Sequence, residues 1–399
     1  MADRDGNYDG SDLLQAAGGL LDDAVAIRRD IHSHPETGLD LPRTQELILD
    51  RLDGAGIAGT PGVRTTSVTA VIDGDLPGPT TLLRADMDAL EMPEDTGLEF
   101  ASTVDGKMHA CGHDAHVSML LGAATLLQHR REDLAGRVVL MFQPGEEGHG
   151  GAKVMLDEGI LEAHGKVDRA FAIHITSVVP TGFVTCRPGT ILASSDEFRI
   201  VVTGGGGHAS MPHDAIDPVP VACEIVTALQ AMVTRRVPAF DPAVVTVTTI
   251  QAGTAFNVIP ESVECKGTIR AVSDRTRDLV VEAVQQVASN IAAAHGCAAS
   301  VEWQDGNYPV TVNDADQAAR TLDVARRVVG TDRAVVMPSP GMGAEDWSYV
   351  LQSVPGSMAI LGAGPPGVAR PAPNHSNRMV IDEPAMAAGI ALYAGMVLV

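Results

Sequence analysis

The chain has 399 residues, of which 45% are hydrophobic but only 3% aromatic, and its formal net charge is −23. This length exceeds one comfortable hydrophobic core and predicts two domains, whose packing must depend on Ala, Val, Leu and Ile. Such an acidic chain lacks the basic surface that nucleic-acid binding requires, and no apolar run reaches membrane-spanning length. We therefore expect neither a nucleic acid nor a membrane as partner.

Cysteine usage indicates the compartment. The five cysteines are odd in number and include no C-x-x-C pair, which argues against a disulfide framework. The first residues show no basic and then apolar stretch of the kind that begins a secretory signal peptide. We expect a cytoplasmic protein, in which a free cysteine thiolate can function.

The first half of the chain alternates between helical and strand patterns. Helices are expected at 13–32, 43–55 and 117–128, and strands at 80–85, 137–142 and 170–173. Such alternation indicates an α/β sheet, whose ligands bind beyond the carboxyl ends of the strands. Polar candidates lie at these ends: Asp86 and Asp88, then Glu146 and Glu147, then His174, which is expected to end its strand.

The pattern changes between about residues 194 and 303. Strands are expected at 197–203, 243–251, 262–271 and 298–303, and helices at 215–235 and 275–294. The order βαββαβ is that of a ferredoxin-like unit. We therefore expect an α/β domain with a mixed central sheet flanked by helices (1–192 and 306–399), interrupted by an inserted ferredoxin-like domain (193–305). A helix at 315–329 and a glycine-rich end complete the chain.

Cys111 and His113 lie two residues apart in the stretch 108–114. Their side chains can face one side only if the backbone is extended or looped there, which the intervening Gly112 allows. Cys and His are ligands that a borderline-soft divalent metal selects. A buried structural cysteine is the alternative for Cys111 alone, but the histidines crowded around it favour a ligand.

Other polar residues near this stretch are candidates for support. Asp114 and Asp86 are expected to orient the metal ligands from behind. His109 and His116 are expected to have structural or supporting roles.

Glu146 and Glu147 follow the predicted strand 137–142 in a glycine-rich turn. Adjacent side chains point to different sides, so one carboxylate can bind a metal while the other acts as base toward water. A solvated acidic turn is the alternative for the pair alone. The spacing does not determine which glutamate has which role.

His174 and His375 indicate little by themselves, because lone histidines are ordinary in a core or on a surface loop. With Cys111, His113 and one glutamate they give a Cys/His/Glu/His/His set, enough for two metals that share a bridging ligand. The sequence thus predicts a metal-dependent hydrolase.

Three polar residues stand out in the expected inserted domain. His208 follows four glycines that lack the pattern of a dinucleotide loop, and no Lys-Ser/Thr pair follows, so we expect a tight turn that presents its imidazole. Asn257 and Arg270 are polar residues in an otherwise apolar region, where ordinary turn and surface chemistry is an equal alternative.

In these residues the chain resembles the aminoacylase-like di-metal amidohydrolases and peptidases, which include hippurate hydrolases, indole-acetyl-amino-acid hydrolases and N-acetyl-diaminopimelate deacetylases. Motifs match in order over almost the whole chain, at 84–90, 109–113, 143–147, 207–213, 257–260, 343–348 and 374–375. The resemblance implies a catalytic α/β domain interrupted by a lid domain that also dimerises. A homodimer, or a dimer of such dimers through the lid, is therefore expected.

The resemblance also implies a division of the metal ligands. It implies that Cys111 bridges two divalent ions, that Glu147 and His375 complete one site, and that His113 and His174 complete the other.

The remaining roles are likewise implied by the resemblance. Glu146 becomes the general base, and His208 reaches the partner subunit's active site to steady an oxyanion. Asn257 and Arg270 approach the substrate from the lid.

Departures from the pattern are small. Arg84 stands where the wider carboxypeptidase relatives have a metal-binding histidine, which fits the subgroup that uses His113 instead. Met379 and Trp347 occupy places where Phe is more usual, so the shape of the pocket and the choice of substrate stay open.

We therefore expect hydrolysis of an N-acyl amino acid to a carboxylic acid and a free amino acid, with two divalent metal ions per subunit. Zinc or manganese is expected, with cobalt or nickel as alternatives. Two other functions stay open: a metallo-exopeptidase (dipeptidase or carboxypeptidase) on the same scaffold, and a non-catalytic ligand-binding protein. Glu146 beside a full ligand set favours an enzyme, because a binding protein has no use for a base.

Overall fold

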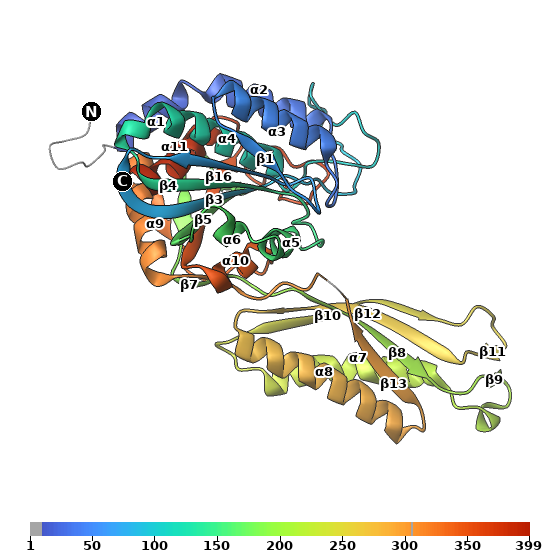
Figure 1. Ribbon diagram of the computed structural model, residues 1–399. Coiled ribbons are helices and arrows are strands. Elements are labelled where there is room, and N and C mark those ends of the chain that lie inside the picture. The colour runs from blue at the N-terminus through green and yellow to red at the C-terminus, as the bar shows by residue number, and fades with distance from the viewer. Residues whose placement is uncertain (1–9, 305) are drawn as a thin grey trace. The chain divides into compact units, whose positions relative to one another are not determined.

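The computed structural model describes residues 10–304 and 306–399, which form two compact units (Figure 1). The first unit comprises residues 10–191, 312–339 and 346–399, and the second comprises 192–304, 306–311 and 340–345. The second unit is thus inserted into the first along the sequence. This confirms the expected fold class.

The first unit is built on a mixed sheet. In the described residues its strand order is β1-β2-β4-β3-β5-β16-β6-β15, and β7 pairs separately with β14. The central strands β3, β4, β5 and β16 run parallel, whereas β2 and β6 pair antiparallel with their central neighbours β4 and β16. The strand bounds are β1 (Gly59–Pro61), β2 (Val68–Asp73), β3 (Leu76–Asp86), β4 (Ala135–Gln143), β5 (Arg169–Pro180), β6 (Val184–Cys186), β7 (Gly189–Leu192), β14 (Thr311–Asn313), β15 (Ala334–Val336) and β16 (Gly356–Gly364).

Helices cover both faces of this sheet, as expected where parallel strands are buried on two sides. In Figure 1, α1, α2, α4 and α11 lie on one side and α5, α6 and α10 on the other. The core between them is dominated by Ala, Val, Leu, Ile and Met, as the low aromatic content requires. The helix bounds are α1 (Gly10–Gly18), α2 (Leu21–Ser33), α3 (Pro42–Gly54), α4 (His113–His129), α5 (Gly151–Asp157), α6 (Ile160–Ala163), α9 (Ala315–Val329), α10 (Trp347–Ser353) and α11 (Ala385–Leu398). No helix in the described ranges is both long and apolar enough to cross a membrane.

The prediction of one helix over 13–32 was wrong, because α1 ends at Gly18 and α2 begins at Leu21. Gly18 and Gly19 explain the break, since glycine is a poor helix former and the pair weakens the helix at two consecutive positions.

The glycine-rich end contains two elements that the sequence did not reveal. β16 pairs in parallel with β5 at the centre of the sheet, and α11 is buried along almost its entire length. A helix that is apolar on all sides has no amphipathic period, so spacing could not identify it. In β16, Gly356 and Gly362 pack so closely on β5 that a Cβ would meet neighbouring backbone oxygens.

The second unit has the expected βαββαβ order. Its antiparallel sheet has the order β10-β12-β8-β13, and α7 and α8 pack on one face of it. The buried residues of β8 alternate, with Phe198, Ile200 and Val202 on the helix side. A separate ribbon pairs β9 with β11. The bounds are β8 (Asp196–Thr203), β9 (Gly207–His208), α7 (Pro218–Arg236), β10 (Ala243–Ala252), β11 (Val258–Ile259), β12 (Ser262–Ala271), α8 (Asp274–Ala294) and β13 (Ala298–Trp303).

A buried ionic network joins α2 to α4 in the first unit. His32 lies between two carboxylates, with Nδ1 2.8 Å from Asp114 and Nε2 3.2 Å from Glu94. Arg28 pairs with the same Asp114 oxygen at 3.0 Å. Burial alone would lower the pKa of His32, but the hydrogen bonds to Asp114 and Glu94 outweigh it and raise that pKa to about 9. The imidazolium form therefore stabilises the packing of α2 on α4.

This network predicts a pH-dependent stability. A folded pKa of about 9 for His32 lies above the ordinary value near 6.5, so its stabilisation, of order 3 kcal/mol, is complete below pH 6.5 and is lost as the pH rises toward 9. The thermal midpoint of the native chain should exceed that of the His32→Gln variant most at pH 6, and the difference should shrink steadily up to pH 9. A difference that is constant or grows over this range would contradict the assignment.

Candidate metal centre

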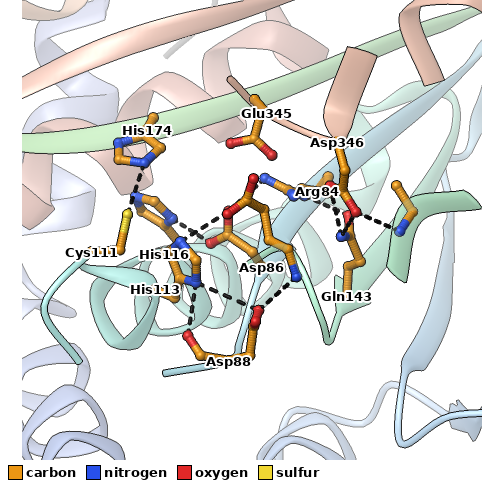
Figure 2. Close-up of polar contacts among 12 residues, drawn as sticks. Arg84, Asp86, Asp88, Cys111, His113, His116, Gln143, His174, Glu345 and Asp346 are labelled. Carbon is orange, nitrogen blue, oxygen red and sulfur yellow. Dashed lines mark hydrogen bonds and ion pairs between the residues drawn. The ribbon is translucent and has the colours of Figure 1, made fainter. Parts of the chain in front are cut away.

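Candidate residues of the first unit gather near the carboxyl ends of its parallel strands, and Figure 2 shows Asp86, Cys111, His113 and His174 among them. Asp86 ends β3, and Glu146 and Glu147 lie just beyond the end of β4. His174 lies within β5, which continues to Pro180, so the expectation that His174 ends its strand was wrong. The extension went unseen because the pattern beyond His174 becomes mixed rather than apolar.

Cys111 and His113 are placed by a left-handed turn. Gly112 has φ +95° and immediately precedes α4, whose first residue is His113. A Cβ at Gly112 would lie 2.4 Å from the Ile175 Cγ2 atom, so the position also requires the absence of a side chain. The turn lets the thiol and the imidazole face the same space, as the spacing predicted.

Two groups of metal-ligating atoms share the Cys111 sulfur. The first contains Cys111, His113 and His174, and the second contains Cys111, Glu147 and His375, with all ligand atoms of each group within 4.8 Å of one another. The Cys111 Sγ lies 3.3 Å from the His174 Nε2, and the His375 Nε2 lies 3.3 Å from a Glu147 oxygen. The five residues predicted as ligands are thus brought together.

The hydrogen bonds of His113 and His174 leave one nitrogen of each ring available to a metal ion. His113 Nδ1 donates to the Asp88 carbonyl at 2.8 Å, and His174 Nδ1 donates to the Ile175 carbonyl at 2.8 Å. Each Nε2 is therefore left to face the cluster. The buried His113 Nε2 atom has no hydrogen-bond partner among the described residues, and the buried Glu147 Oε1 atom faces the His375 ring at 3.3 Å. An unsatisfied buried polar atom is costly, and a divalent ion would satisfy the His113 nitrogen.

The pKa shifts agree with such a site. Burial and then the neighbouring His116 lower the pKa of His174 to about 3, so its ring is neutral and can donate a lone pair. Burial raises the pKa of the Cys111 thiol. Hydrogen bonds to Cys111 and then Glu147 raise the pKa of His375 to about 10. The thiol and the carboxylate therefore surround a place where positive charge is favoured.

Asp86 supports this cluster from the end of β3. One Asp86 oxygen accepts a hydrogen bond from His116 Nδ1 at 2.5 Å, and the other lies 3.6 Å from His113 Nε2. His116 Nε2 in turn accepts from the Ile175 amide at 2.7 Å, next to His174. His116 thus links α4 to β5 behind the cluster, the supporting role that the sequence left open for it.

Arg84 lies beside the cluster as an ion-pair partner. Its buried guanidinium pairs with Asp86 at 2.5 Å and with Asp346 at 3.0 Å, and it donates to Gln143 at 2.8 Å (Figure 2).

Asp114 lies away from the cluster, although it was expected to orient a ligand. Its recorded partners are Arg28 and His32. Consecutive residues of a helix point about 100° apart, so His113 faces the cluster while Asp114 faces α2. His109, also buried, has neither ring nitrogen hydrogen-bonded to a described residue.

Asn374 is a supporting residue that the sequence analysis did not single out. Its amide donates to the Cys111 carbonyl at 2.8 Å and to the Ile175 carbonyl at 3.1 Å, so it ties the loop of His375 to the other ligand segments. His375 has φ +67°, and it is the one residue other than glycine with positive φ in the described ranges. Asn374 belongs to the matched motif 374–375 and lies next to His375, but neither fact indicates its contacts with the Cys111 and Ile175 carbonyls.

His208, Asn257 and Arg270 belong to the second unit. His208 ends the short strand β9, where it pairs with Val258 of β11, and begins a tight turn closed by the hydrogen bond from the Met211 amide to the His208 carbonyl at 2.8 Å. Its Nδ1 accepts from the Ser210 amide at 3.1 Å. Asn257 is exposed just before β11, and Arg270 is half-buried on β12. None of the three lies in the ligand groups of the first unit.

Known proteins resemble the chain along its length. The model of peptidase family M20/M25/M40 matches residues 82–399. The chain is 38% identical to thermostable carboxypeptidase 1 of Saccharolobus solfataricus over 93% of both chains. It is 41% identical to the IAA-amino acid hydrolase ILR1-like 2 of Arabidopsis thaliana, over 94% of this chain and 85% of that one. A Bacillus subtilis structure described as a dinuclear metal binding peptidase has a TM-score of 0.81 and 32% identity, covering 96% of this chain and 98% of its own.

The left-handed turn predicts a selective defect. Gly112→Ala places a Cβ against Ile175 and adds a left-handed penalty of about 1–2 kcal/mol, so the loop should shift and separate the Cys111 and His113 ligands. Zinc affinity, measured by competition with a chromogenic chelator, should fall at least about tenfold while the circular dichroism spectrum is retained.

Gly296→Ala is the matched control. Gly296 has φ +74° after α8, and an added Cβ there would meet nothing within 4 Å. This variant should keep native zinc affinity. Unchanged affinity in Gly112→Ala would show that the turn does not set the ligand geometry.

Proposed function

We propose that this chain, which belongs to peptidase family M20/M25/M40, hydrolyses the amide bond of N-acyl amino acids to a carboxylic acid and a free amino acid. The observation on which this depends is the position of Glu146. Its carboxylate lies within 4.8 Å of ligand atoms of His113 and Glu147, and it is 6% exposed. A carboxylate held at the edge of a ligand cluster is suited to act as base toward a nucleophilic water.

The proposed division of ligands follows the two groups that share Cys111. Cys111 would bridge two divalent ions, with His113 and His174 on one and Glu147 and His375 on the other. A thiolate, three imidazoles and a carboxylate suit zinc, and manganese is the second expectation, with cobalt or nickel as alternatives. Bound there, such ions would lower the pKa of water and polarise the substrate carbonyl.

The residues of the chain then have separate tasks. Glu146 takes a proton from the attacking water and returns it to the leaving nitrogen. His116 and Asn374 keep the ligand side chains oriented, because each connects two of the segments from which the ligands come. Asp86 contributes by holding His116 and facing His113 on α4.

The second unit is proposed to supply substrate contacts. The Ser210 amide donates to His208 Nδ1, so a neutral His208 has its proton on Nε2, where it can donate to an oxyanion. Asn257 and Arg270 would bind the substrate carboxylate, for which a guanidinium is a suitable partner.

A homodimer through the second unit is part of the proposal, with His208 serving the active site of the partner. Two features support it. β10 is an edge strand of its sheet and exposes Val244 and Ile250, and Phe256 and Val258 expose apolar surface around β11. Unpaired edges and apolar patches of this kind are typical of surfaces that pair with another chain. A dimer of dimers is the larger alternative.

A reducing compartment, the cytoplasm, is also proposed. All five cysteines are free in the structure, and the bridging role of Cys111 requires its reduced thiolate.

A metallo-exopeptidase is the second candidate, and it is favoured by the similarity to a carboxypeptidase. The two activities differ in the group next to the scissile amide: a dipeptide has a free α-amine there, and an acyl chain has none. Relative kcat/KM for N-acetyl-methionine and alanyl-methionine distinguishes them, because both share the same leaving amino acid.

Glu146 and Glu147 should respond differently to the same substitution. Glu146→Gln should retain two metal ions per subunit and lower kcat for an N-acetyl amino acid by about 10²–10⁴-fold, because the base is lost. Glu147→Gln should lose metal affinity. Metal content by mass spectrometry and initial rates check both, and a Glu146→Gln variant with native kcat refutes the assigned base.

Sharing of sites between subunits predicts complementation. Glu146→Gln and His208→Ala subunits, each inactive alone, should regain partial activity when mixed, because one site of each heterodimer has both intact residues. Up to about half of the heterodimer sites can recover in this way. Heterodimers purified with two affinity tags provide the sample, and homodimers treated in the same way are the control. Complete inactivity of verified heterodimers would exclude sharing.

A further inference from the structure

We propose that Asp88 is a positioning residue whose carboxylate fixes the Glu146–Glu147 turn relative to the ligand His113. The inference rests on the proposed function, since it concerns how the base and two ligands are held. Asp88 follows β3, is 1% exposed and lies directly beside His113 (Figure 2).

The Asp88 carboxylate binds the turn through both oxygens. Its Oδ1 accepts the Glu146 amide at 2.9 Å, and its Oδ2 accepts the Glu147 amide at 3.1 Å. One side chain therefore holds two successive peptide units, which fixes the direction in which both glutamate side chains leave the backbone.

The same residue orients His113. The Asp88 carbonyl accepts from His113 Nδ1 at 2.8 Å, and the Asp88 Oδ1 lies 3.6 Å from that nitrogen. Since the Nδ1 proton is engaged there, His113 Nε2 is left for the ligand cluster. Asp88 thus contacts both the ligand His113 on α4 and the turn after β4, and it fixes the position of one relative to the other.

The turn needs such an external contact because its own backbone is permissive. Gly145 and Gly148 flank the glutamate pair with φ +73° and +84°, a region in which glycine is free and other residues are not. The local hydrogen bonds, from the Gly148 amide to the Glu146 carbonyl and from the Gly151 amide to the Gly145 carbonyl, join the turn only to its own neighbourhood. A displacement near 1 Å of a reacting group can lower a rate about 10²-fold.

Asp88→Asn tests this role with little change in shape. An amide has one acceptor oxygen, so its nitrogen would face one of the two backbone N–H groups, and the turn would lose a contact. The backbone carbonyl that orients His113 is unchanged. We expect zinc affinity, from chelator competition, to fall about 10- to 100-fold, and kcat to fall by a similar factor at saturating zinc with KM nearly unchanged.

Glu36→Gln is the matched control. The Glu36 carboxylate also accepts two successive amides through separate oxygens, from Arg43 at 3.2 Å and from Thr44 at 2.8 Å, at the start of α3. This variant removes the same kind of contact without touching a predicted ligand. It should show native zinc affinity and kcat, and its metal-free thermal midpoint gives the structural cost of such a change.

Hydrogen exchange adds a readout that needs neither metal nor substrate. The peptide that contains Glu146 and Glu147 should exchange faster in metal-free Asp88→Asn than in the native chain, while peptides from α3 stay unchanged. If Asp88→Asn does not fold, Asp88→Ser replaces it in the test. The serine variant also lacks the two carboxylate oxygens, but it places no side-chain NH2 group against the backbone N–H groups of the turn. Loss of fold in both variants overturns the proposal, because the role would then be structural.

The outcomes separate this inference from the proposed function. Native zinc affinity, kcat and exchange in Asp88→Asn overturn the role of Asp88 and leave the hydrolase intact. A native chain that binds zinc but cleaves no N-acyl amino acid overturns the proposed function, while the affinity and exchange measurements still decide the role of Asp88. The role of Asp88 is also overturned if the thermal midpoint of Asp88→Asn falls further than that of Glu36→Gln while its zinc affinity stays native.

Discussion

The candidate centre depends on the parallel register of β3, β4 and β5. Pairing of Asp86 with Gln143 across β3 and β4 sets the ends of these strands at the same edge of the sheet. The segments that carry the other site residues lie at this edge. The turn of Glu146 follows β4, and the left-handed Gly112 directs Cys111 and the start of α4 toward the edge. Parallel strands collect the following loops at one edge, and polar groups can gather there without interrupting the core.

Buried charge is the main cost of this arrangement. Burial by itself disfavours the charged form of Asp86, but Arg84 and then the histidines His113 and His116 outweigh it and lower its pKa well below the ordinary range. Arg84 also pairs with the buried Asp346. A pair of this kind contributes little net stability, because desolvation offsets the attraction, but it leaves few alternative arrangements for the side chains that it joins. The network therefore serves to fix positions rather than to stabilise the fold.

Residues of the site differ in how visible they are in the sequence. Cys111, His113 and the two glutamates form short motifs whose residue types already indicate metal chemistry. Asp88 and Asn374 act through contacts to backbone atoms of distant segments, and no local pattern predicts such contacts. Asp114 lies next to a predicted ligand in the sequence, but the helix turns its side chain toward Arg28 and His32 of α2.

The sequence by itself determined the alternation of strands and helices, the βαββαβ order of the second unit and the residue types of the centre. These features depend on local hydrophobic period and on side-chain chemistry. Only the tertiary structure decided that β16 is a central strand, that α11 is buried, and that Asn374 ties the loop of His375 to the backbone at Cys111 and Ile175. Such features depend on contacts between segments that lie far apart in the sequence. A local stretch of residues does not reveal the free energy of those contacts.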